Sequence, residues 1–223
     1  MGRMKINVID LSGKVSVQCI ASLAECPPGT MIRMWTLQHK DAVEQLKSNG
    51  HLTVQPEYSF PDSKQRWKLA AYEWMKGEMQ QRIPGYKGEL PVWCGLSDSS
   101  VSENYDRNTN DILLRVEVPM ERALIHFRHG WENVLESFQA IGKDGEFTGS
   151  RNPYLVANEA DQREVHSKNC RIPSHSKDEY RASWKKIFDL GLATSNGFCW
   201  AQGSPLQAVL PLLYLDDVME FLS

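Results

Sequence analysis

Residues 31 to 52 read MIRMWTLQHKDAVEQLKSNGHL and contain the clearest secondary-structure signals of the chain. From 31 to 38, Ile32 and Met34 alternate with Arg33 and Trp35, which is typical of a strand that buries one face. Asp41 is expected to cap a short helix that follows, and Asn49-Gly50 supplies the left-handed residue that ends it. The stretch therefore predicts a strand, a helix and a terminating glycine.

The remaining chain mixes helical and strand patterns instead of alternating them regularly. Helices are predicted from Pro61 to Pro84 and from Trp131 to Gly142, and a third begins at the S-x-x-E capping box of Ser176. Strands are predicted at residues 90–94, 112–118 and 206–215, and Pro211 within the last of these favours a bulge or an edge position. We therefore expect an α+β fold, with a mixed sheet core and flanking helices.

Segments at the start and in the middle of the chain lack this regularity. Residues 1–30 hold two short strand patterns around Ser12-Gly13 and are predicted to form an N-terminal β appendage, which leaves 31–223 as the main domain. Residues 97–110 and 143–174 are polar stretches with little periodicity. Such long loops are often binding surfaces or active-site covers.

The charge balance, the cysteines and the apolar runs of the chain limit which partners and which compartment are expected. The 223 residues carry 25 Lys and Arg against 28 Asp and Glu, so no global positive field attracts nucleic acid or a membrane surface. A nucleic-acid partner would need a local basic patch, such as residues 64–68 or 181–186. The five widely spaced cysteines are typical of reduced thiols, and no apolar run is long enough to cross a bilayer, so a cytoplasmic protein without membrane contact is expected.

The sequence lacks the motifs of several common enzyme classes and of zinc sites. No G-x-G-x-x-G or P-loop is present, which disfavours dinucleotide-fold dehydrogenases and kinases. His126 and His129, or His166 with Cys170 and His175, have spacings conceivable for zinc, but neither set is complete, and no metal is expected. Ser183 and the cysteines lack a local nucleophile signature.

Two segments resemble ADP-ribosyltransferases of the DarT-like toxin family. The opening M-W-T-L-Q with its helix and glycine is similar to the family's first motif, with Thr36 at the nicotinamide-contacting His or Arg and Gln38 at the family's Thr. The closing L-Q-A-V-L is similar to the strand that presents the family's catalytic Glu, and Gln207 falls at or next to that position. Gln207 departs from the family because a carboxamide carries no charge and cannot act as a general base.

A larger part of the chain, residues 33 to 222, resembles an uncharacterised bacterial domain family by five motifs in order. They are W-T-x-Q at 35–38, A-Y-x-W-M at 71–75, P-x-W at 91–93, an L-x-V-E-V-P strand at 114–119 followed by Trp131, and a closing Q-A at 207–208.

The resemblance implies an NAD-dependent ADP-ribosyltransferase that modifies a macromolecule, either nucleic acid or protein. It would be a toxin in bacterial conflict or phage defence, with an antitoxin or chaperone as a further partner. Gln207 and Thr36 are the expected catalytic residues, and the general base would be Glu57, Glu73 or Glu117.

Aromatic side chains are suited to bind the nicotinamide ring of NAD. A cationic nicotinamide gains about 0.5–2 kcal/mol from an aromatic face. Trp35, Tyr72 and Trp93, with the amide of Gln38, are the expected NAD-binding residues, whereas Trp67, Trp131 and Trp184 are expected in the core. The alternative is a noncatalytic nucleotide-sensing or partner-binding module on the same fold, because Gln207 lacks the catalytic charge.

Overall fold

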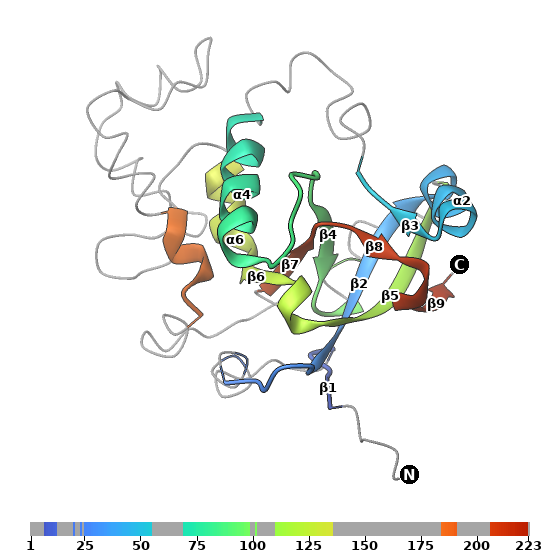
Figure 1. Ribbon diagram of the computed structural model, residues 1–223, viewed down its shortest axis with the longest axis horizontal. Coiled ribbons are helices and arrows are strands. Elements are labelled where there is room, and N and C mark those ends of the chain that lie inside the picture. Colours follow the sequence, from blue (N-terminus) through green and yellow to red (C-terminus); the bar gives the residue numbers. More distant parts are fainter. Residues whose placement is uncertain are drawn as a thin grey trace.

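The computed structural model describes residues 7–12, 20, 23, 25–54, 69–98, 101, 110–135, 184–190 and 206–222. The main sheet runs in the order β6 (Leu124–Phe127), β7 (Leu206–Leu210), β4 (Val92–Gly95), β2 (Met31–His39), β5 (Asp111–Pro119) and β9 (Val218–Leu222), and β1 (Val8–Ile9) pairs with β2. A second, two-stranded sheet joins β3 (His51–Leu52) to β8 (Leu213–Tyr214). Figure 1 shows these strands with α2 (Lys40–Asn49), α4 (Leu69–Arg82) and α6 (Arg128–Leu135) around them. The expected α+β class is confirmed.

Strand β2 and helix α2 form where the alternating pattern predicts them. Ile32 and Met34 are fully buried on β2, and Val43 and Leu46 of α2 pack in the same cluster. Gly50 ends the helix at φ 75°, a left-handed conformation that glycine adopts without a Cβ penalty.

The beginning of α2 differs from the prediction that Asp41 caps it. The helix starts at Lys40, and the N-cap is His39, whose Nδ1 accepts the backbone N–H of Asp41 at 3.3 Å. Asp41 lies in the first turn of the helix, where a carboxylate interacts favourably with the positive end of the helix dipole.

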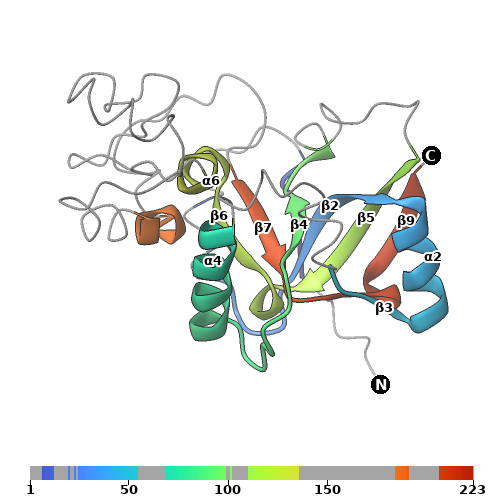
Figure 2. The same ribbon diagram turned by 90° about the horizontal axis from the view of Figure 1, so that it is seen from above.

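Two helices lie at one end of the sheet and one helix lies at the other. In Figure 2, α4 and α6 lie beside β6 and β7, whereas α2 lies beside β5 and β9. The α4 and α6 side contains an aromatic core in which Trp131 and Trp184 are almost fully buried, as predicted. Trp67 lies outside the described residues.

The closing segment is not one strand. Pro211 ends β7, because proline has no N–H to donate to a ladder, and β7 lies between β6 and β4 without a bulge. The expected bulge or edge position at Pro211 is therefore wrong. The chain continues through β8 and the turn η5 (Leu215–Asp217) to β9, the last strand beyond β5.

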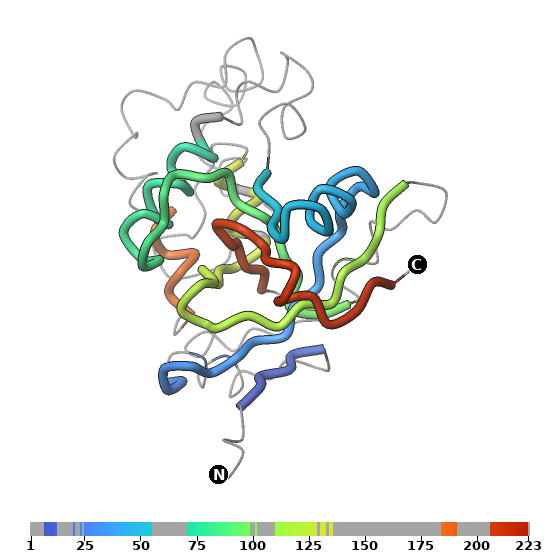
Figure 3. Tube along the Cα trace, turned by 45° about the vertical axis from the view of Figure 1, so that its right-hand side comes forward, coloured from blue at the N-terminus to red at the C-terminus, as the bar shows by residue number. Residues whose placement is uncertain are grey.

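The N-terminal segment contacts the main sheet. Val8 and Ile9 pair in parallel with Met31 and Ile32, and β1 runs beside the start of β2 in Figure 3. Three other apolar residues of this segment are buried in the same core as β2: Leu11, Ile20 and Leu23. A boundary between residues 30 and 31 stays a prediction.

Several predicted features fall outside the described residues. Helix α4 is described from Leu69 and α6 only as far as Leu135. The irregular segment 143–174, most of the loop 97–110 and both basic clusters, apart from residues 184–186 of the second, lie outside the described part. Within that part, η4 (Lys185–Phe188) is a 3-10 turn that buries Ile187.

Candidate functional site

Strands β2 and β4 separate after a single paired position, Trp35 opposite Gly95. Beyond this pair, side chains instead of a backbone ladder connect the strands. The Thr36 hydroxyl donates to the carbonyl oxygen of Trp93 at 2.7 Å, and the Gln38 amide donates to the Thr36 oxygen at 2.7 Å. The separation leaves space between the second half of β2 and the beginning of β4.

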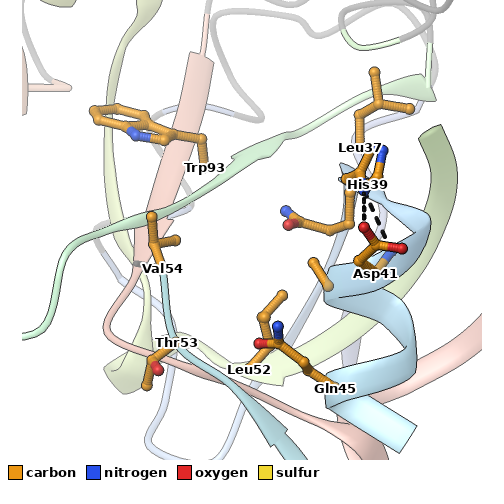
Figure 4. A pocket seen from close by; sticks show the side chains of 10 residues that line it. Leu37, His39, Asp41, Gln45, Leu52, Thr53, Val54 and Trp93 are labelled. Carbon is orange, nitrogen blue, oxygen red and sulfur yellow. Dashed lines mark hydrogen bonds and ion pairs between the residues drawn. The ribbon is translucent and has the colours of Figure 1, made fainter. Parts of the chain in front are cut away.

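One pocket of about 250 Å³ fills this space and extends to α2 and β3; we name it the α2 pocket. Figure 4 shows Val54 and Trp93 across the pocket from Asp41 and His39, and the Asp41 carboxylate lies 3.4 Å from His39 Nδ1. Apolar and polar side chains both line it: Leu37, Gln38, His39, Asp41, Ala42, Gln45, Leu52, Thr53, Val54 and Trp93. Such a mixed lining suits a flat ring that carries a few hydrogen-bonding groups.

A second pocket of about 240 Å³, the β7 pocket, also has Trp93 in its lining. It is lined by Leu37, Trp93, Cys94, Gly95, Val101, Arg128, Leu206 and Gln207. Leu37 and Trp93 line both pockets, so the two adjoin along these side chains. Arg128 brings a positive charge to the wall of the β7 pocket, and its Nε donates to Glu132 at 3.2 Å.

The sheet register brings the first and closing motifs into one row. Gly95 of β4 pairs with Trp35 on one side and with Gln207 on the other, and Gln207 in turn pairs with His126 of β6. Residues directly opposite one another project from the same face of a sheet. Two strand spacings, roughly 10 Å, therefore separate the backbones of Trp35 and Gln207. Gly95 has no side chain, so β4 places nothing between them.

The predicted NAD-binding residues divide into pocket residues and supporting residues. Trp93 lines both pockets and Gln38 lines the α2 pocket. Trp35 is 5% exposed and lines neither pocket. Tyr72 also lines neither and packs edge-on against Trp93 with ring centroids 5.8 Å apart.

The two residues predicted to be catalytic lie in different environments. Gln207 lines the β7 pocket, whereas Thr36 is 1% exposed and lines neither pocket. The contacts of Thr36 are with the backbone of Trp93 and the side chain of Gln38, so its hydroxyl connects strands.

The general-base candidates lie away from both pockets. Glu73 is exposed on α4 and pairs with Lys76 at 3.1 Å, and Glu117 accepts from Arg33 Nε at 2.9 Å. Glu57 lies outside the described residues. Among the described lining residues, Asp41 is the sole carboxylate.

An aromatic cluster holds Trp93 rigidly. The Trp93 ring stacks on Trp131 with centroids 4.7 Å apart and planes inclined by 27°, and Tyr72 contacts both rings edge-on. Burial raises the pKa of the Tyr72 hydroxyl. Aromatic packing therefore holds the Trp93 side chain that lines both pockets.

Two buried groups on the strands around the β7 pocket, His126 and Cys94, are held uncharged. Burial lowers the pKa of His126 to about 3, so its imidazole is neutral at physiological pH. Burial raises the pKa of the Cys94 thiol to about 12, so Cys94 is not a thiolate nucleophile in the folded protein. In the described part of the chain, no group of three or more His, Cys, Asp or Glu residues gathers to hold a metal ion. Nor is any described helix long and apolar enough to span a bilayer.

Comparison with known families places this site inside a known domain. Residues 33–208 match the family described as Domain of unknown function (DUF3841). The chain belongs to the DUF3841 family. Every residue that lines either pocket of this DUF3841 domain lies within the matched range. No curated protein and no solved structure matches the chain.

His39, Asp41 and Arg128 line the pockets of the DUF3841 domain and were not among the predicted site residues. His39 and Asp41 follow directly after the strand that carries Gln38, and their polar character at a strand-to-helix junction was a usable signal. Arg128 begins α6 right after β6, but only the pairing of β6 with β7 brings it to Gln207.

Proposed function

We propose that this DUF3841 domain binds NAD across the two adjoining pockets and transfers ADP-ribose to a macromolecule, as an ADP-ribosyltransferase of the cytoplasm. The register that joins Trp35, Gly95 and Gln207 supports this proposal, because it puts the two segments that resemble DarT-like enzymes in one row. Trp93 lines both pockets, and an aromatic side chain there suits contact with a nicotinamide or adenine ring.

The proposed chemistry assigns separate tasks to the two pockets. Cleavage of the nicotinamide–ribose bond develops positive charge on the ribose, so a catalyst must orient the sugar and stabilise that charge. Gln207 supplies a hydrogen-bonding carboxamide in the β7 pocket. The chain has no carboxylate at position 207. Asp41 supplies one in the α2 pocket instead.

Incubation of the purified protein with NAD labelled in its adenylate and with a bacterial lysate tests transfer. We expect release of nicotinamide and label in either nucleic acid or protein. Gln207→Ala should lower the rate at least tenfold, whereas Gln80→Ala, on the exposed face of α4, should not change it. No nicotinamide release and no labelled product would refute the transferase.

A toxin role makes a separate prediction in cells. Expression of the wild-type protein should arrest bacterial growth, the Gln207→Ala variant should not, and a co-expressed antitoxin or chaperone partner should restore growth. Normal growth with an active enzyme would refute the toxin role and leave the transferase proposal in place.

Binding without transfer is the second candidate, and the lining of the β7 pocket favours it. None of the described residues that line this pocket is a carboxylate, and Gln207 is neutral. Under this candidate, calorimetry measures NAD binding, but no extract supports nicotinamide release. Measurement of both quantities on one protein sample separates the candidates.

A further inference from the structure

Two buried side-chain nitrogen atoms without a hydrogen-bond partner belong to neighbouring residues of β6 and β7. Gln207 and His126 pair directly in the register, so both project from the same face, with Cβ atoms about 5 Å apart. Among the described residues, neither the Gln207 Nε2 nor the His126 Nε2 has a hydrogen-bond partner. A buried polar nitrogen without a partner costs about 1–3 kcal/mol, so two such atoms side by side need an explanation.

The protonation of His126 decides what its free nitrogen can do. His126 Nδ1 lies 3.4 Å from the carbonyl oxygen of Phe127, and a carbonyl can only accept. Nδ1 therefore carries the proton of the neutral ring, and Nε2 is an acceptor. The Gln207 Nε2 is a donor, so the two unpartnered atoms are complementary.

The surroundings fix the histidine and leave the glutamine adjustable. The His126 ring is fully buried and meets Trp93 edge-on, with centroids 5.8 Å apart, and Phe188 at 6.0 Å. Gln207 is half-buried, and the terminal torsion of a glutamine has a broad energy minimum. Rotation of that amide toward His126 turns the Gln207 oxygen toward the β7 pocket.

We propose that His126 is a positioning residue that holds the Gln207 amide nitrogen inward, so that Gln207 presents its carbonyl oxygen to the β7 pocket as an acceptor for a ligand hydroxyl. Arg128 lies in the wall of the same pocket, so the ligand that fits is a hydroxyl-bearing anion such as the ribose phosphate part of a nucleotide. The nucleotide identity rests on the proposed function, whereas the pairing of His126 with Gln207 does not.

A double-mutant cycle, with NAD as the probe in calorimetry, tests whether His126 acts through Gln207. His126→Phe keeps an aromatic ring for Trp93 and removes the acceptor. We expect it to weaken NAD binding about fivefold to tenfold in the wild-type background and less than twofold in the Gln207→Ala background. Equal losses in both backgrounds would show a merely structural effect and overturn the inference.

The Gln207 side-chain amide resonances provide a test that needs no ligand. In the apo protein, the two amide protons should have widely separated shifts because only one is bonded to His126, and His126→Phe should bring them together. His126→Asn, which keeps an acceptor, should retain part of the separation. Absence of NAD binding to the wild type would refute the proposed function alone, whereas amide shifts that do not respond to His126→Phe would refute the pairing.

Discussion

The Thr36 hydroxyl donates a 2.7 Å hydrogen bond to the carbonyl oxygen of Trp93 across the point where β2 and β4 separate. The Gln38 amide donates to the same hydroxyl. Thr36, which the resemblance predicts to be catalytic, therefore connects β2 to β4. It positions one pocket residue on each strand, Gln38 on β2 and Trp93 on β4.

Thr36→Val should destabilise the protein by about 1–3 kcal/mol, because the isosteric methyl leaves the Trp93 carbonyl and the Gln38 amide without their partner. Urea unfolding at neutral pH measures the change. Thr36→Ser keeps the hydroxyl and is the matched control, expected within about 1 kcal/mol of the wild type. A valine variant as stable as the wild type would contradict the strand-connecting role.

Trp93→Phe should weaken NAD binding about threefold to tenfold, because the smaller ring reduces the shared wall of both pockets. Trp74→Phe is the matched control: Trp74 packs against Trp184 and Phe188 and lines neither pocket. Calorimetric titration with NAD compares the two variants. Similar losses in both would show that general packing, not the pocket wall, controls affinity.

His126 should make stability depend on pH. Its folded pKa of about 3 lies below the ordinary value near 6.5, so the unfolded chain binds the proton first as the pH falls. The contribution is complete above about pH 6.5 and should decline by roughly 1 kcal/mol per pH unit between about pH 6 and pH 3.

The His126→Phe variant isolates this contribution. Urea unfolding between pH 7 and pH 4 should give a shallower loss of stability for the variant than for the wild type. His51→Asn, at the exposed position of β3, removes a histidine without removing a buried imidazole and should keep the wild-type slope. Parallel pH profiles for wild type and His126→Phe would contradict the prediction.

Asp217→Ala should cost about 2–4 kcal/mol. The carboxylate is 7% exposed, accepts from both terminal nitrogens of Arg122 at 2.7 and 2.9 Å, and accepts from the Tyr214 backbone at 2.9 Å. Removal of one partner leaves the other charge partly buried, and the partial exposure of Arg122 reduces the cost. The exposed neighbour Asp216→Ala should change the unfolding free energy by less than about 0.5 kcal/mol.

Local patterns predicted the elements that have strong signals of their own. The alternation through Ile32 and Met34 predicts β2 because one face of that strand meets the core. Gly50 predicts the end of α2 because only a left-handed residue fits there. The cap at His39 was missed because histidine is a rare N-cap, and its role depends on the bend at the end of β2.

Candidate site residues could be predicted where a local sequence motif contains them, but not where only the pairing of distant strands brings them to the site. Gln38, Trp93 and Gln207 were recognisable from motifs, and all three line a pocket. Arg128 and the pairing of His126 with Gln207 had no signal in the sequence, because β6 and β7 are separated by a long stretch of chain and meet only in the sheet.

The α+β class, the strand–helix–glycine unit at residues 31–50 and the residue types available for the site could be predicted from the amino-acid sequence, because they follow from local periodicity and turn chemistry. Only the tertiary structure decided that β4 lies between β2 and β7 and that the strands separate beyond Trp35 and Gly95. Strand order and register depend on contacts between distant segments. Those contacts make Trp93 the shared wall of two pockets and place His126 beside Gln207.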